Sequence, residues 1–148
     1  MKLAVFIVIV CTVLAFGHPA PDFTPSMGAY EVRCDSSVVI NQATATTTQL
    51  VALAAGKKIY VCSATVNQVG AVTAPTFQFV YGTGANCVTG QVALTGVITG
   101  ANVAGTITNP QFGGTGLGYV FSAPASQALC ITTTTTQPQK GLLSYTQF

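Results

Sequence analysis

Hydrophobic and polar residues alternate in short runs along most of the chain, and Gly, Pro and Asn separate the runs. The runs are rich in Val, Ile, Thr, Tyr and Phe, which favour β-strands. No apolar stripe with helical spacing persists long enough to predict a helix. The pattern predicts about nine short strands, at 32–40, 49–53, 58–66, 76–81, 91–98, 105–108, 118–122, 128–135 and 141–147.

Alternation within these strands predicts which side chains face the interior. Leu129 and Ile131 should point inward, so Cys130 should point outward. In the strand at 58–66, strict alternation gives one face with Ile59, Val61, Ser63 and Thr65 and another with Tyr60, Cys62, Ala64 and Val66. Many short strands between turn residues are typical of a sandwich or barrel. We predict an all-β fold, a single jelly-roll- or immunoglobulin-like antiparallel β-sandwich over 30–148.

The N-terminal segment has the features of a secretory signal peptide. Lys2 supplies a positive charge, and Leu3 to Leu14 form an apolar run that is short for a membrane span. Small residues follow, which favours cleavage before His18 and predicts a signal peptide at 1–17; an uncleaved anchor is the alternative. After cleavage we expect a proline-rich lead-in at 18–29, no stable membrane span, and a secreted or cell-surface protein.

The cysteines predict disulfide bonds. Of the five, Cys11 lies in the predicted signal peptide, which leaves Cys34, Cys62, Cys87 and Cys130. An even number in an exported domain favours disulfides, and no C-x-x-C pair supports a zinc or redox site. The sequence alone leaves three connectivities open. We expect Cys34–Cys62 and Cys87–Cys130, with the second bridge on an outer face or a loop because Cys130 should point outward.

Charge is scarce, and this limits the chemistry of the chain. From Ser36 onward it contains no Asp, Glu or His, and its only charged residues there are Lys57, Lys58 and Lys140. General acid–base catalysis and metal binding need such groups, so we expect a protein that is not an enzyme and holds no metal or cofactor. A secreted hydrolase would have to rely on a buried lysine as its base. The net charge of +2 without a basic cluster excludes a nucleic-acid interface.

Some uncharged residues are candidates for binding a neutral ligand. Tyr60 and Tyr119 could stack on a sugar ring, although core packing explains most aromatic residues in such a fold. Two predicted loops contribute the other candidates, Gly82, Asn86 and Gly116. The glycine-rich stretch around Gly116 precedes a predicted strand rather than a helix, so it is not a phosphate-binding loop.

Several short stretches resemble β-sandwich modules of tailed-phage virion proteins and bacterial surface proteins. The stretches are 54–61 (AAGKKIYV), 79–84 (FVYGTG), 94–96 (LTG), 123–130 (APASQALC) and 143–145 (LSY). The resemblance covers roughly the last two-thirds of the chain and includes no chemical motif. It implies a jelly-roll-like sandwich that serves as a structural or decorating part, with no catalytic residues to carry over.

Together these features favour a secreted, non-catalytic structural or adhesive surface protein. Its low charge reduces repulsion between copies, so a homo-oligomer or a contact with a surface is expected. The alternative is a binding module for a neutral ligand such as a glycan.

Overall fold

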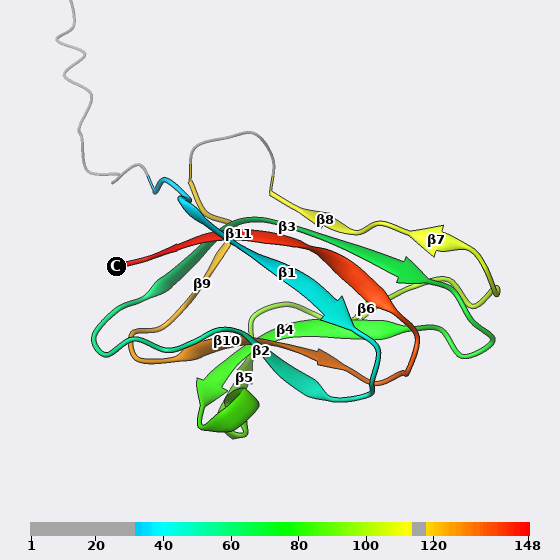
Figure 1. Ribbon diagram of the computed structural model, residues 1–148, viewed down its shortest axis with the longest axis horizontal. Helices are drawn as coiled ribbons and strands as arrows, with labels where there is room; N and C mark the ends of the chain where they lie inside the picture. Colours follow the sequence, from blue (N-terminus) through cyan, green and yellow to red (C-terminus); the bar gives the residue numbers. More distant parts are fainter. Residues whose placement is uncertain (1–31, 114–117) are drawn as a thin grey trace, which may run out of the picture. The chain divides into compact units, whose positions relative to one another are not determined.

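The computed structural model describes residues 32–113 and 118–148, which form two antiparallel β-sheets packed face to face (Figure 1). The prediction of an all-β sandwich is confirmed. The predicted signal peptide at 1–17, the lead-in at 18–29 and Gly116 lie outside the described residues. Within the described part, no helix is long and apolar enough to cross a membrane.

Sheet A contains the two longest strands. Its order is β1 (Ser36–Gln42), β11 (Gln139–Gln147) and β3 (Ile59–Val69), followed by β7 (Ile107–Thr108), β8 (Gln111–Phe112) and β9 (Phe121–Ala123), which pair in turn along the far side of β3. Sheet B has the order β2 (Thr47–Val51), β10 (Ala128–Thr133) and β4 (Thr76–Thr83), with β5 (Thr89–Ala93) and β6 (Ile98–Thr99) along the far side of β4.

The strand order selects between the two predicted sandwich types. Strands β1, β3 and β11 lie in sheet A and β2, β4 and β10 in sheet B, so the chain changes sheets at each step from β1 to β4 and again from β10 to β11. The short strands β5 and β6 act as one strand beside β4, and β7, β8 and β9 act as one beside β3. With these groups, the order is that of a jelly roll rather than an immunoglobulin domain.

Most predicted strand boundaries differ from the structure by a few residues, and two differences raise the number of strands from nine to eleven. The strand expected at 91–98 is interrupted, because the backbone N–H groups of Leu94 and Thr95 both donate to the carbonyl of Phe79. The short strand β8 was not predicted, because Pro110 indicated a connection. The carbonyl of Pro110 nevertheless accepts from the backbone N–H of Val66, which holds this segment beside β3.

Phenyl rings fill the centre of the space between the sheets. The ring of Phe79 on β4 lies 5.6 Å from Phe77, 5.6 Å from Phe112 and 5.3 Å from Phe121, measured between ring centroids. Edge-to-face and tilted contacts at these distances add to the burial of apolar area. Since Phe112 and Phe121 belong to the short strands of sheet A, these strands are held by the core as well as by their few backbone hydrogen bonds.

A β-bulge in β3 overturns the predicted faces of that strand. Val61, Ala64 and Val66 are all buried in the core, whereas strict alternation placed Val61 opposite the other two. Tyr145 and Ser144 of β11 are consecutive, but their partners on β3 are Val61 and Ser63. Cys62 is therefore the extra residue of a bulge, which reverses the inward phase of the strand after it.

Candidate functional site

The two disulfides have the expected pairing. Cys34 and Cys62 are joined across a Cα–Cα distance of 6.1 Å, and Cys87 and Cys130 across 6.3 Å. Two disulfides in a small domain are typical of an oxidising, extracytoplasmic environment. With all four cysteines bonded, the described residues offer no free thiol for nucleophilic or metal chemistry.

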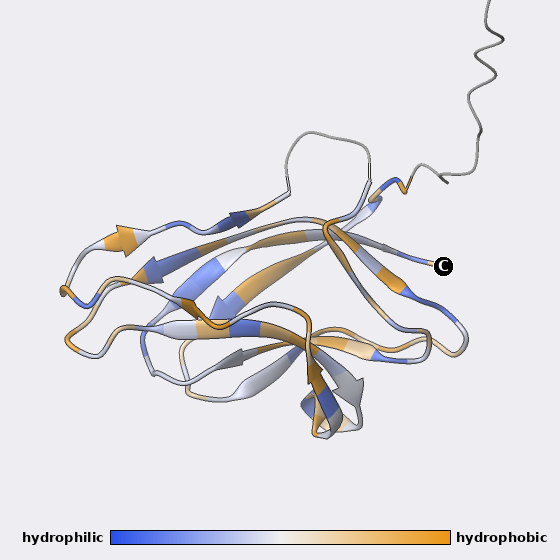
Figure 2. Ribbon diagram, turned by 180° about the vertical axis from the view of Figure 1, so that it is seen from behind, coloured by the Kyte–Doolittle hydropathy of each residue, from blue (hydrophilic) through white to orange (hydrophobic). Residues whose placement is uncertain are grey.

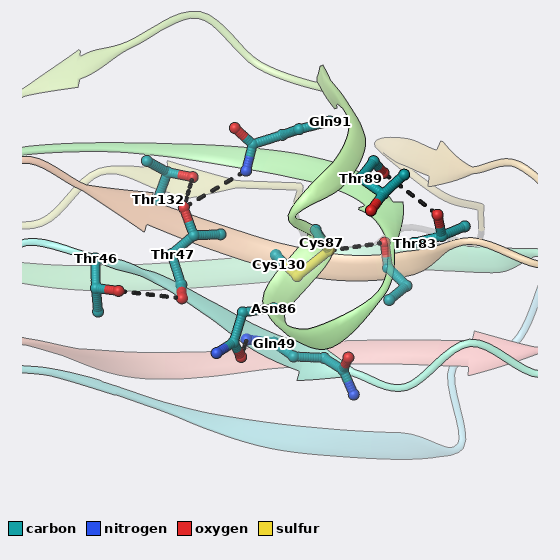
Figure 3. The surroundings of a disulfide bond; sticks show 11 residues. Thr46, Thr47, Gln49, Thr83, Asn86, Cys87, Thr89, Gln91, Cys130 and Thr132 are labelled. Atoms are coloured by element: carbon teal, nitrogen blue, oxygen red, sulfur yellow. Dashed lines mark hydrogen bonds between the residues drawn. A yellow bond between two sulfur atoms is a disulfide. The ribbon is translucent and has the colours of Figure 1, made fainter.

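The Cys87–Cys130 bridge attaches a turn to the outer face of sheet B (Figure 3). Leu129 and Ile131 belong to the main core, whereas Cys130 belongs to a separate cluster with Val80 and Ala128, so the prediction that Cys130 points outward is confirmed. The turn η1 (Ala85–Cys87) covers this cluster, and both cysteines are 0% exposed.

Two of the predicted loop candidates belong to this turn and its approach. Gly82 is buried within β4 rather than in a loop, and a Cβ at this position would lie 2.8 Å from the carbonyl oxygen of Cys87. Asn86 is exposed and adopts a left-handed conformation, with φ of 53°. Its Oδ1 accepts a hydrogen bond of 3.0 Å from the backbone N–H of Gln49 on β2 (Figure 3). Gly82 therefore does not lie at the surface, and the Asn86 side chain serves to hold the turn against β2.

The Cys34–Cys62 bridge holds the segment before β1 against sheet A. Cys62 is the bulged residue of β3, and the bridge brings residues 32–35 to the outer face of the sheet. Val32 in this segment is buried, and so is Thr146 on β11. The segment held by this bridge covers only one end of the sheet.

The structure brings Tyr60 and Tyr119 together. Their ring centroids lie 5.0 Å apart in an edge-to-face contact, and Phe148 stacks on Tyr60 at 4.8 Å. Tyr119 is 51% exposed and Phe148 is 56% exposed, so this aromatic cluster is open to solvent. Phe148 is fixed there by backbone hydrogen bonds in both directions with Lys58. Sequence reasoning singled out both tyrosines but not Phe148 as their partner.

At the end of β3 away from Tyr60, a row of polar side chains crosses the inner face of sheet A, and we call it the polar row. Gln42, Gln139, Gln68 and Thr108 occupy neighbouring positions on β1, β11, β3 and β7. The three glutamines are buried. The side-chain amides of Gln68 and Gln139 donate to the carbonyls of Pro75 and Thr76, at 3.2 and 3.1 Å, and thus link sheet A to the start of β4. Sequence reasoning missed this polar row, although glutamine at an inward strand position signals it.

A shallow hollow of about 760 Å³ lies beyond this polar row. Residues from four connections line it, among them Ala45, Gly70, Thr73, Gly105, Thr135 and Gln137. Every lining residue is uncharged and none is aromatic. The hollow therefore lacks both the charges and the ring faces that usually fix a small ligand.

The described residues contain no metal-binding cluster, because no three His, Cys, Asp or Glu side chains in the described ranges could together hold a metal ion. Lys57 and Lys58 are both exposed. The single histidine, His18, and the carboxylates Asp22 and Glu31 lie outside the described residues.

The middle of the outer face of sheet A is a broad surface with little charge. Three rows of outward-facing residues cross β1, β11 and β3: Ser37, Ser144 and Ser63; Val39, Leu142 and Thr65; and Asn41, Lys140 and Asn67. Lys140 carries the only charge in these rows. In the middle row, Val39 is 68% exposed and its partner Leu142 is 48% exposed, which makes a small apolar patch among hydroxyl and amide groups. No protein-family model, curated protein or solved structure matches this chain, so only its own geometry bears on its function.

Proposed function

We propose that this protein is an exported, non-catalytic structural or adhesive surface component that acts through contact between uncharged β-surfaces. The observation that carries the proposal is the outer face of sheet A, where an exposed Val39–Leu142 pair lies in a field of Ser, Thr and Asn with a single charge. Such a face can approach another copy or a neutral surface with little electrostatic repulsion and little cost of desolvating charge.

Three further features support this role. The two disulfides and the predicted signal peptide suit an extracytoplasmic part that must resist unfolding outside the cell. The jelly-roll strand order is compatible with the resemblance to virion and bacterial surface modules. The outer face of sheet A exposes apolar and hydroxyl side chains side by side, which suits contact with an uncharged surface.

Light scattering after size-exclusion chromatography tests this proposal. We expect the mass of the mature protein to rise with concentration, and we expect salt to change this rise little because the contact surface is almost uncharged. Val39→Lys should weaken the association, whereas Val97→Lys, at an exposed position between β5 and β6, should leave it unchanged. A strictly monomeric protein that binds no surface at high concentration would contradict the proposal.

A second candidate function, binding of a neutral glycan, is favoured by the aromatic cluster of Tyr60, Tyr119 and Phe148. Its exposed rings provide apolar faces next to phenol hydroxyls, an arrangement that suits the C–H and O–H groups of a sugar ring. A glycan array with the wild-type protein and Tyr119→Ala tests it, with Val120→Ala as the neighbouring exposed control. Binding that is lost only in Tyr119→Ala would support this candidate, and an array without a hit would remove it.

A further inference from the structure

Strand β1 forms an open edge of sheet A. It pairs through its full length with β11 on one side, from Ser36–Tyr145 to Gln42–Gln139, and no described strand pairs with its other side. Its seven residues contain no charge, no proline and no glycine, and no register shift interrupts its ladder with β11. Figure 2 shows its hydrophobic middle in orange and its hydrophilic arrowhead in blue. Long, regular and uncharged edges are the ones that pair with another chain.

The other sheet edges carry features that discourage such pairing. In β2 the backbone N–H of Gln49 is already bonded to the side chain of Asn86, and a register shift interrupts its pairing with β10. In β5 a register shift and Gly90, with φ of 61°, disturb the strand. The far edge of sheet A consists of β7, β8 and β9, which have only two or three residues each. Short, bulged or blocked edges are the usual means of preventing association.

The sequence of β1 is self-complementary under a two-fold axis. If two copies pair antiparallel with Val39 opposite Val39, Val38 meets Ile40, Ser37 meets Asn41, and Ser36 meets Gln42. Apolar residues then face apolar residues, and polar residues face polar ones. The seven residues of β1 carry no charge, so no like charges meet across this pairing. Symmetric homodimers require this kind of self-complementary surface.

We infer that β1 pairs antiparallel with β1 of a second copy of this chain about a two-fold axis at Val39, which joins the two copies of sheet A into one continuous sheet. This inference rests on the proposed function, because it names the surface through which copies associate. The exposed Val39 side chains lie side by side at the centre, and the backbone groups of the open edge gain partners.

Engineered cysteines test this geometry in the full mature chain. Directly opposed residues of an antiparallel pair have Cα atoms about 4.5 or 5.5 Å apart, which is within the range that a disulfide spans. Val39→Cys should therefore form a covalent dimer under mild oxidation. The matched control is Leu142→Cys, on the same face one strand further from the axis, where the two cysteines would lie about 14 Å apart. We expect Val39→Cys to cross-link at least about tenfold faster.

A mixture of two variants tests the register. Ser37→Cys and Asn41→Cys should each cross-link poorly alone, because their own copies are offset by four residues, or about 13 Å along the strand. Mixed together, they should form a heterodimeric disulfide. Circular dichroism and the number of free thiols in each variant establish that the native disulfides and fold are intact.

The outcomes separate this inference from the proposed function. Equal cross-linking of Val39→Cys and Leu142→Cys would mean that copies meet face to face, which overturns the edge pairing but keeps the proposed function. Concentration-dependent association without cross-linking at Val39 would likewise overturn only the edge pairing. A wild-type protein that stays monomeric and binds no surface, with no Val39 cross-link, would overturn both.

Discussion

The outer faces of sheet A and sheet B are covered to different extents by the segments that the disulfides hold. On sheet B, the turn η1 lies over the outer face, the Cys87–Cys130 bridge fixes it there, and Asn86 bonds the edge strand β2 (Figure 3). On sheet A, the Cys34–Cys62 bridge holds residues 32–35 over one end, whereas Val39 and Leu142 further along the face are exposed and no described strand pairs with the outer edge of β1. The Cys87–Cys130 bridge thus helps to cover the outer face of sheet B, whereas the Cys34–Cys62 bridge leaves most of the outer face of sheet A exposed.

Removing each disulfide gives the largest test of this difference. Cys87→Ala with Cys130→Ala should lower the free energy of unfolding by about 4 kcal/mol, because the bridge closes a long loop and covers a buried cluster. Cys34→Ala with Cys62→Ala should cost about 3 kcal/mol, since it closes a shorter loop and covers less. Urea unfolding of both variants measures the two values. A larger loss for the Cys34–Cys62 pair would reverse the comparison.

The polar row provides the next largest test, because it ties sheet A to sheet B. Gln139→Glu keeps the shape of the side chain but places a carboxyl where the native residue is 0% exposed, and burial raises the pKa of that carboxyl. The protonated acid can still donate to Thr76, so stability should be nearly native near pH 4. At pH 7 the unfolded state ionises freely and the folded state does not, which should cost about 3 kcal/mol.

Gln111→Glu is the control for this variant, because Gln111 is an exposed position on β8 of the same sheet. Its stability should stay within about 0.5 kcal/mol of the wild type at both pH values. Thermal unfolding as a function of pH measures both variants. A Gln139→Glu protein that is as stable at pH 7 as at pH 4 would show that the polar row is not sealed from water.

Gly82→Ala tests how closely η1 is packed on sheet B. The added Cβ would lie 2.8 Å from the carbonyl oxygen of Cys87 and 3.0 Å from that of Thr89, so the turn must move away. We expect a loss of about 2 kcal/mol in unfolding free energy. Gly90→Ala is the control, because its Cβ would meet nothing within 4 Å and only its positive φ should cost about 1 kcal/mol. A loss at Gly82 no larger than that at Gly90 would show that the turn is not closely packed on β4.

The smallest effect is expected for Asn86→Ala, which removes the hydrogen bond to the edge strand β2. Stability should fall by about 1 kcal/mol. Amide hydrogen exchange should also become faster at Gln49 while remaining unchanged in β1. Val88→Ala, an exposed neighbour of the same turn, serves as the control. Unchanged exchange at Gln49 would mean that Asn86 does not protect this edge.

Much of the fold was predictable because its determinants are local. The runs of β-branched and aromatic residues predicted the strands, and alternation around Leu129 and Ile131 correctly predicted that Cys130 points outward. Alternation failed at Cys62, where a bulge changes the phase of β3. Such a bulge depends on how β3 pairs with β11, which is remote in sequence, so local pattern does not reveal it.

The candidate sites were less predictable for the same reason. Tyr60 and Tyr119 were named for their residue type, but their contact, and the stacking of Phe148, result from the pairing of distant strands. Gly82 was expected in a loop, yet it is buried in β4 because the following turn folds back over it. The polar row requires neighbouring positions on separate strands, which only the register of the sheet establishes.

The sequence by itself determined that this chain is built from β-strands, that four cysteines remain after the predicted signal peptide, and that few charged groups are available from Ser36 onward. These properties follow from residue type and short-range periodicity. Only the tertiary structure decided that the order is a jelly roll, that η1 closes one sheet, and that β1 is left unpaired at the edge of the other among the described strands. Strand edges and registers depend on the packing of strands far apart in sequence, so no local stretch of the sequence determines them.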